Sequence, residues 1–218
     1  MDLLKVLQQR YTTKAYDASK VIAQPQFDQL LEVLKLTPSS INIQPWHFFV
    51  ADTTSAKERI ATALVGDYAY NSAKVLNASH TIVFCSKTEI DPEHLSNIIT
   101  QEAQDGRFKD QQVQQNQMNS RTFYVDYYRR EQGDISRWTE NQTFIALGQL
   151  LLAAALQGID ATPIGGFNAE ILSQELKLKE QGLKPSVIVA LGYRSEQDFN
   201  APLPKSRLDQ DKIISILS

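Results

Sequence analysis

Apolar residues recur at the spacing of amphipathic helices in the first part of the chain. After Gln24, the apolar side chains of residues 27–34 fall on one face, and the proline that follows Gln24 is favoured at a first helical position. Asp2 can cap an earlier helix that runs to about Gln9, and a further helix is expected over residues 54–64. We therefore expect helices that each bury one face.

Runs of β-branched and aromatic residues predict strands over residues 46–51, 81–85 and 186–193. The last of these runs is apolar on both faces, which is typical of a central strand. A short strand is also expected over residues 211–217. Because no internal repeat, low-complexity tract or linker separates these elements, the sequence predicts an α+β fold with a single domain over residues 1–218.

The second half of the chain predicts further helices of different character. Asp91 followed by proline is typical of a helix start, and residues 101–137 are polar, mostly helical in propensity and interpreted as peripheral. Residues 141–157 carry apolar side chains on almost every face, so this helix must be buried by a large core or by another subunit. Gly158 suits its end, and a helix over residues 168–178 follows.

Composition and charge exclude several classes of function. The chain has 218 residues, of which 42% are hydrophobic and 22% charged, and its formal net charge is -3. These values fit a globular protein and argue against a general nucleic-acid binder, which usually carries a basic face. The start lacks a signal peptide's apolar stretch, and the apolar run over residues 144–156 is shorter than the ~20 residues of a membrane span. We expect a cytoplasmic protein with neither nucleic acid nor membrane as partner.

Familiar catalytic motifs and metal-ligand patterns are missing from the sequence. Cys85, the single cysteine, falls in a predicted buried strand, which favours a packed, inert thiol and excludes an internal disulfide framework. His47, His80 and His94 are isolated, without the spacing that would place two ligands on one helix face. The glycine-rich and serine motifs of dinucleotide folds, P-loop enzymes and α/β-hydrolases are absent as well. No metal site is predicted.

Two short basic runs lie near opposite ends of the chain. Side chains two apart point the same way in an extended segment, so Arg10, Thr12 and Lys14 can face one partner, and so can Lys205 and Arg207. The proline before Lys205 favours the extended conformation there. If folding joins the two runs, their side chains match an anion with about two negative charges, such as a phosphate monoester. A solvated surface is the alternative for either run alone.

Three loop segments, over residues 37–46, 70–74 and 163–166, are rich in small and polar residues that can bring backbone N–H groups close to a ligand. Together with the basic runs, they closely resemble the nitroreductase family of flavin enzymes, in particular the oxygen-insensitive NAD(P)H nitroreductases and dihydropteridine reductases. The resemblance covers essentially the whole chain. The motifs that carry it are Arg10-Tyr11-Thr12-Thr13-Lys14, Pro38-Ser39-Ser40-x-Asn42-x-Gln44-Pro45-Trp46, Asn71 with Lys74, and Leu203-Pro204-Lys205-Ser206-Arg207.

This resemblance implies a bound FMN, a mixed central sheet flanked by helices, and a homodimer that completes the domain and places two flavin sites in its interface. It also implies an oxidoreductase in which NADH or NADPH reduces FMN and a flat electrophilic acceptor then reoxidises it, in a ping-pong cycle. Nitroaromatics, quinones and oxidised pterins are such acceptors. No side chain is expected to act as a catalytic group, because the cofactor carries the chemistry. The sequence does not separate NADH from NADPH.

The resemblance also implies that Lys14 and Lys74 lie near the pyrimidine edge of the flavin, where positive charge favours its reduction. It implies that Asn71 forms hydrogen bonds with the neighbouring imide edge. Residues 163–164 cover one flavin face, and residues 38–42 come from the partner subunit. The cofactor-binding candidates are Arg10, Tyr11, Thr12, Lys14, Pro38, Ser39, Ser40, Asn42, Asn71, Lys74, Pro163, Ile164, Gly165, Gly166, Lys205 and Arg207. The substrate-binding candidates are Ile41, Tyr70, Phe123 and Tyr124.

Two positions depart from the family pattern. Gly165 stands where related sequences carry an acidic residue, and Ile41 replaces a smaller, polar one, so we expect a more apolar acceptor site and a shifted substrate preference. Three alternatives remain open: a flavin-fragmenting or dehalogenating enzyme on the same scaffold, a non-enzymatic FMN carrier or sensor, and a helical interaction module without cofactor.

Overall fold

Side-chain caps fix several helix starts in the computed structural model, which describes residues 2–217. The Asp2 carboxylate accepts from the backbone N–H groups of Leu4 and Lys5, and Asp91 accepts from that of His94. Both predicted starts are confirmed. The helices are α1 (Leu3–Gln9), α2 (Gln24–Lys35), α3 (Thr54–Ala61), α4 (Ser72–Asn77), α5 (Pro92–Gln104), α6 (Gln111–Arg130), α7 (Ile135–Leu156) and α8 (Ala169–Glu175).

Four strands form one sheet in the order β1-β2-β4-β3. They are β1 (Trp46–Ala51), β2 (His80–Lys87), β3 (Asp160–Ile164) and β4 (Leu183–Gly192). Neighbouring strands are antiparallel throughout, and the one parallel pairing among residues 2–217 is a single bridge between Thr12 and Ala161. The predicted α+β class is confirmed, and within the described chain the sheet is mixed only through this bridge.

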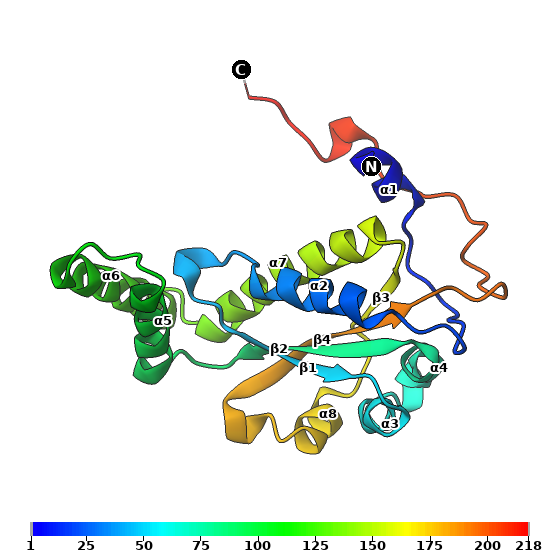
Figure 1. Cartoon of the computed structure of the whole chain (residues 1–218), viewed down its shortest axis with the longest axis horizontal. Coiled ribbons are helices and arrows are strands. Elements are labelled where there is room, and N and C mark those ends of the chain that lie inside the picture. The colour runs from blue at the N-terminus through cyan, green and yellow to red at the C-terminus, as the bar shows by residue number, and fades with distance from the viewer. Residues whose placement is uncertain (1, 218) are drawn as a thin grey trace.

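The central strands bury both of their faces. On β4, Val187, Val189 and Leu191 belong to the apolar core on the side of α2 and α7, whereas Ile188 and Ala190 belong to the core on the other side. The alternation has the period of two that a strand imposes. Helices α2 and α7 cover one face of the sheet, and α3, α4 and α8 cover the other (Figure 1). The predicted two-sided central strand is confirmed.

Helix α7 crosses the sheet with one face buried and another exposed. Leu150 and Ala154 are fully buried against the sheet, whereas Phe144 and Ile145 are 47% and 42% exposed. The core therefore accounts for only part of the apolar surface of this helix. Its predicted start at residue 141 is wrong, because Asp134 caps the helix and its first residue is Ile135.

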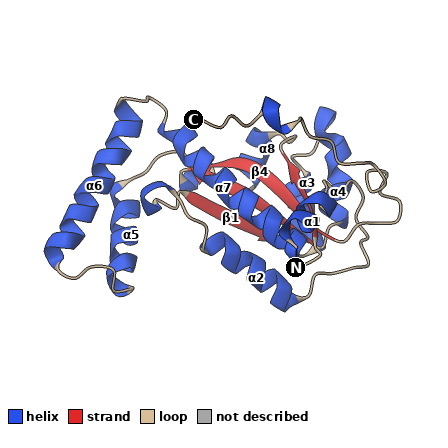
Figure 2. Ribbon diagram, turned by 90° about the horizontal axis from the view of Figure 1, so that it is seen from above, coloured by secondary structure: helices blue, strands red, loops and turns tan. Residues whose placement is uncertain are grey.

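Helices α5 and α6 form a hairpin beside the sheet (Figure 2). Its core is separate from the two sheet cores and includes Leu95 and Ile98 of α5, Val125 of α6, and Trp138 of α7. The peripheral, helical character predicted for residues 101–137 agrees with this arrangement. None of the helices described is long and apolar enough to cross a membrane.

Several predicted boundaries are wrong. Pro163 and Ile164, expected in a loop, lie in β3. The helices predicted to end at residues 64 and 178 stop at Ala61 and Glu175. The largest difference is at residues 211–217, where the predicted strand is replaced by a short 3-10 turn (Gln210–Lys212) and an exposed extension that leaves the body of the molecule (Figure 1). This segment joins no sheet because none of the described strands lies next to it.

Candidate functional site

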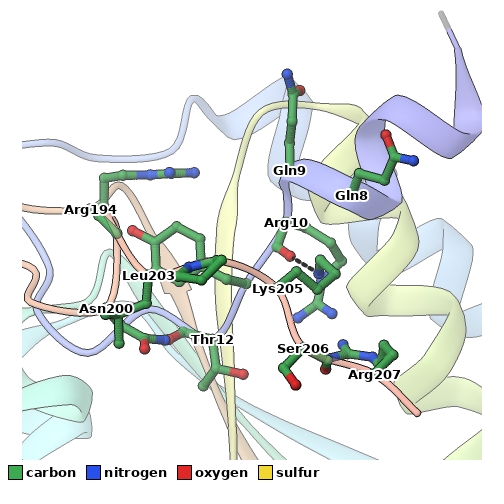
Figure 3. Close-up of a pocket in the computed structure, with 13 residues that line it drawn as sticks. Gln8, Gln9, Arg10, Thr12, Arg194, Asn200, Leu203, Lys205, Ser206 and Arg207 are labelled. Atoms are coloured by element: carbon green, nitrogen blue, oxygen red, sulfur yellow. Dashed lines mark hydrogen bonds between the residues drawn. The ribbon is translucent and has the colours of Figure 1, made fainter. Parts of the chain in front are cut away.

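The two basic runs meet beside strand β3. The Asn200 side chain donates to the Thr12 carbonyl at 2.8 Å, and the Lys205 ammonium donates to the Arg10 carbonyl. Thr12 is in turn bridged to Ala161 of β3, so the sheet fixes the position of the first run. Residues close to both ends of the sequence therefore lie side by side in one cluster (Figure 3).

This cluster surrounds a cavity of about 500 Å³. Five of the predicted cofactor-binding residues line it. None of the Asp and Glu side chains of residues 2–217 does. The predicted residues are Arg10, Tyr11, Thr12, Lys205 and Arg207. The other lining residues, which were not predicted to bind the cofactor, are Gln8, Gln9, Arg194, Asn200, Ala201, Leu203, Pro204 and Ser206. The cavity is a concave, basic surface of the size of a small ligand.

The cations of the cavity repel one another. Burial, followed by the charge of Arg207, lowers the pKa of the Arg10 guanidinium. Burial also lowers the pKa of the Lys205 ammonium, with further contributions from Arg10 and Arg207. A bound dianion would offset this repulsion, since opposite charges close together favour the charged forms. The electrostatics of the cavity therefore favour an anionic ligand.

Arg194 is the charged residue of this cavity that the sequence did not reveal. Its guanidinium pairs with the Asp160 carboxylate at 2.6 Å and lies over the Tyr11 ring, 4.7 Å from the ring centroid. The Tyr11 hydroxyl donates to Asp198 at 2.9 Å. Because these partners are distant in sequence, spacing gave no signal for them. The contacts hold the Tyr11 side chain, which belongs to the first basic run, in place.

A second predicted cluster lies at the start of α4. The Lys74 ammonium donates to the Asn71 side-chain oxygen at 2.7 Å and lies 4.6 Å from the centroid of the Tyr70 ring, while the Asn71 amide donates to the Gly166 carbonyl at 2.9 Å. Burial lowers the pKa of Lys74, and the charge of Lys14 lowers it further, which brings Lys14 into the same electrostatic environment. Residues from three separate segments thus converge here.

Gly166 packs tightly against this second cluster. A Cβ atom at that position would lie 3.1 Å from the Asn71 amide nitrogen and 3.1 Å from the Tyr68 ring, which is tighter than ordinary contact. At Gly165, by contrast, an added Cβ meets no atom within 4 Å. Ile164 is buried in β3, and Pro163 is half-buried. The end of β3 therefore offers a close backbone approach at one glycine and open space at the other.

The loop Pro38–Asn42 and the aromatic residues Phe123 and Tyr124 are far from the first two clusters. This loop follows α2 and lies at the α5–α6 end of the sheet, whereas α1 and α4 lie at the opposite end (Figure 1). Phe123 and Tyr124 project from α6 and are 65% and 44% exposed. A single chain therefore does not bring together all the predicted site residues.

Comparisons with known proteins identify relatives of this chain. The model of the Nitroreductase family matches residues 7–193. An oxygen-insensitive NAD(P)H nitroreductase from Salmonella typhimurium is 43% identical over 208 residues, which are 95% of this chain and 96% of that protein. The chain belongs to the nitroreductase family. A protein of the same name from Enterobacter cloacae is 41% identical over 215 residues, 99% of each chain.

Solved structures show the nitroreductase fold as well. A crystal structure from Exiguobacterium sibiricum, determined in complex with FMN, superposes with a TM-score of 0.82 at 22% sequence identity and covers 100% of this chain and 98% of that one. The family and the fold predicted from the motifs are therefore confirmed. The structural match leaves the assignment of individual site residues as a prediction.

The single thiol and the metal-ligating side chains of this nitroreductase-family chain offer no second candidate site among residues 2–217. Cys85 is fully buried in β2, and burial raises the pKa of its thiol to about 12, so the reactive thiolate is scarce near neutral pH. Residues 2–217 contain no group of three His, Cys, Asp or Glu side chains that could hold a metal ion. The two cation-bearing clusters thus remain the candidate site.

Proposed function

We propose that this chain is an FMN-dependent oxidoreductase that uses NADH or NADPH to reduce flat electrophilic acceptors such as nitroaromatics and quinones. The observation that carries the proposal is the cation-lined cavity formed by both basic runs. A phosphate monoester carries a charge of about −1.5 to −2 at pH 7, and arginine donors match its oxygens in pairs. The names of the relatives, which include NAD(P)H and nitro reduction, support the same activity.

The residues present fit the phosphate of FMN. Arg10, Lys205 and Arg207 supply positive charge, and Thr12 supplies a neutral hydroxyl donor; we call these four residues the cationic fork. The fork residues line one cavity with Arg194. Because the pKa values of Arg10 and Lys205 are both lowered by burial and by neighbouring cations, a dianion would relieve a repulsion that already exists.

The second cluster fits the ring of the flavin. When bound, FMN supplies the transfer of two electrons between the nicotinamide and the acceptor. Lys14 and Lys74 would supply positive charge to the bound ring as it gains electrons, and such preorganised charge is most effective where water is excluded. The Asn71 side chain is held by Lys74 and by the Gly166 carbonyl, so its orientation is fixed before a ligand arrives.

The proposed enzyme is a homodimer in which the loop Pro38–Asn42 of one subunit completes the site of the other. Ile213, Ile214, Ile216 and Leu217 support this proposal, since these apolar side chains are between 54% and 94% exposed on the extension beyond the 3-10 turn. The exposed face of α7 provides more apolar surface of the kind that obligate dimers bury. The walls of the acceptor pocket would be Tyr70, Ile41, Phe123 and Tyr124; this assignment and the cytoplasmic location stay predictions.

An anaerobic absorbance titration tests the proposed function. The purified protein, reconstituted with FMN, is expected to lose its flavin band near ~450 nm on addition of NADH or NADPH and to recover it when a nitroaromatic or a quinone is added, because the cofactor must pass two electrons in each half-reaction. A yellow protein that neither nucleotide bleaches would identify a carrier or sensor. A colourless protein that binds no FMN would reject the flavin assignment itself.

Replacing Gly165 with Glu is expected to change the preference among acceptors. A Cβ atom at this position meets no atom within 4 Å, and a carboxylate there would disfavour acceptors that are anionic or become anionic. We expect the ratio of kcat/KM for a neutral quinone to that for a cationic nitroaromatic to fall by about tenfold, which corresponds to about 1.4 kcal/mol. Gly165→Gln, which has the same size without the charge, should keep the original ratio. Indistinguishable acceptor profiles for all three proteins would reject the role of this position.

A further inference from the structure

The loop that follows α2 has an unusual backbone conformation. Ile41, Asn42 and Gln44 have φ angles of 50°, 55° and 45°, in the left-handed region. A β-branched residue such as Ile41 rarely adopts this conformation, because its side chain crowds the backbone. Such residues persist only where surrounding contacts hold them, and they cluster at functional sites. This loop therefore needs contacts from the surrounding structure to hold it.

A buried ion pair makes these contacts. Arg121 of α6 donates through Nε to the Ile41 carbonyl at 2.8 Å, and through both terminal nitrogens to the Glu102 carboxylate at 2.8 and 2.6 Å. The Asn42 amide donates to the same carboxylate at 2.8 Å. The Arg121 and Glu102 residues are only 1% and 3% exposed. One charge pair thus binds α5, α6 and the loop together.

The pair is better suited to fixing a geometry than to stabilising the fold. Desolvation of two charges offsets much of their attraction, and apolar residues often pack as stably in such places. Burial alone would raise the pKa of Glu102, but the donors Arg121 and Asn42, with the more distant Arg107, outweigh it and lower the pKa, so the carboxylate stays ionised. The bidentate pairing and the Nε donor leave Arg121 a single arrangement.

We propose that Arg121 and Glu102 are positioning residues that hold the loop Ser39–Asn42 in the conformation in which it contacts FMN in the partner's site. The inference rests on the proposed function, since that loop is assigned to the flavin there. Because Arg121 lies on α6, close in sequence to Phe123 and Tyr124, the pair also joins the proposed acceptor wall to the flavin-contacting loop. The two parts of the site then keep a fixed relation to each other.

Conservative variants test this role. Arg121→Lys keeps the charge but loses the bidentate geometry and the Nε donor, and Glu102→Asp keeps the charge but shortens its reach. Both are expected to weaken FMN binding by about tenfold, as measured by the recovery of free-flavin fluorescence, and to change the visible circular dichroism of the bound flavin. Arg129→Lys is the matched control, since Arg129 lies on the same helix and the hydrogen-bond partners of its side chain among residues 2–217 are Glu89, Asp126 and the Ile90 carbonyl. It should stay within about twofold of the original affinity.

A rescue separates positioning from general support of the fold. Glycine adopts positive φ without steric cost, so Ile41→Gly should lower the need for an external hold on the loop. In the Arg121→Lys background, this second substitution is expected to recover at least half of the loss in FMN affinity, measured on a logarithmic scale of Kd. A purely structural role for the pair would leave the loss unchanged.

The outcomes separate this inference from the proposed function. If the unsubstituted protein binds no FMN, the proposed function fails first. If it binds FMN and Arg121→Lys and Glu102→Asp bind equally well with unchanged dichroism, only the positioning role is overturned. Should both conservative variants fail to fold while Arg129→Lys folds, the pair supports the fold as a whole, and the positioning role is likewise rejected.

Discussion

Replacing Lys205 and Arg207 together with Gln is expected to weaken FMN binding by at least about a hundredfold. Each substitution removes charge-assisted hydrogen bonds to the phosphate, which contribute about 1.5–3 kcal/mol apiece, and every 1.4 kcal/mol corresponds to about tenfold in Kd. The remaining fork residues, Arg10 and Thr12, would bind the phosphate with fewer donors. Titration of the variant with FMN, followed by quenching of flavin fluorescence, measures the loss.

A nearby cation supplies the control for this prediction. Lys212 lies beyond the fork on the same exposed segment, and it is absent from the cavity lining. Among residues 2–217, its ammonium pairs with Asp211 alone, at 3.6 Å. Lys212→Gln removes one positive charge without touching the fork and should leave the FMN affinity within about twofold. If the double variant and this control bind FMN with the same affinity, the phosphate lies elsewhere.

Placing aspartate at both Ile214 and Ile216 is expected to convert the protein into a monomer that has lost most of its FMN affinity. These side chains are 54% and 88% exposed in one chain, so a charge there costs little in the monomer, but burying it in a dimer interface without a partner is highly unfavourable. The monomer would lack the loop Pro38–Asn42 of its partner. Sedimentation and an FMN titration on the same sample report both effects.

Ser215→Asp is the control, because it adds a single carboxylate at a polar position between the two isoleucines. It should remain a dimer and keep its flavin. A double variant that stays dimeric would show that the extension does not form the interface. A monomeric variant with full FMN affinity would show that one chain completes the site without its partner.

Sequence reasoning succeeded where the determinants are local. The caps Asp2 and Asp91 and the two-sided strand around Val189 depend on neighbouring residues, so their patterns were sufficient. Pro163 was placed in a loop because residues 163–166 form a segment rich in small and polar residues; however, β3 lies at the edge of the sheet, where proline is tolerated. The strand expected over residues 211–217 is wrong for one chain because no strand among the described residues pairs with it.

The candidate site was likewise predictable where its residues form local motifs. The basic runs and the Asn71–Lys74 pair have short, specific motifs, and the structure brings each group together. Arg194 and the Arg121–Glu102 pair were missed because their partners are distant in sequence or lie on two different helices, so no spacing reveals them. Long-range contacts of this kind depend on how the chain folds rather than on any local pattern.

Binding of FMN and of riboflavin to the unsubstituted protein, measured side by side by calorimetry, is the most direct test of the cationic fork. The two ligands share the flavin ring and differ in the phosphate, for which Arg10, Lys205 and Arg207 are proposed to supply the donors. FMN is expected to bind at least about a hundredfold more tightly, given about 1.5–3 kcal/mol for each charged contact. Equal affinities for the two flavins would contradict the convergence of both chain ends on a phosphate.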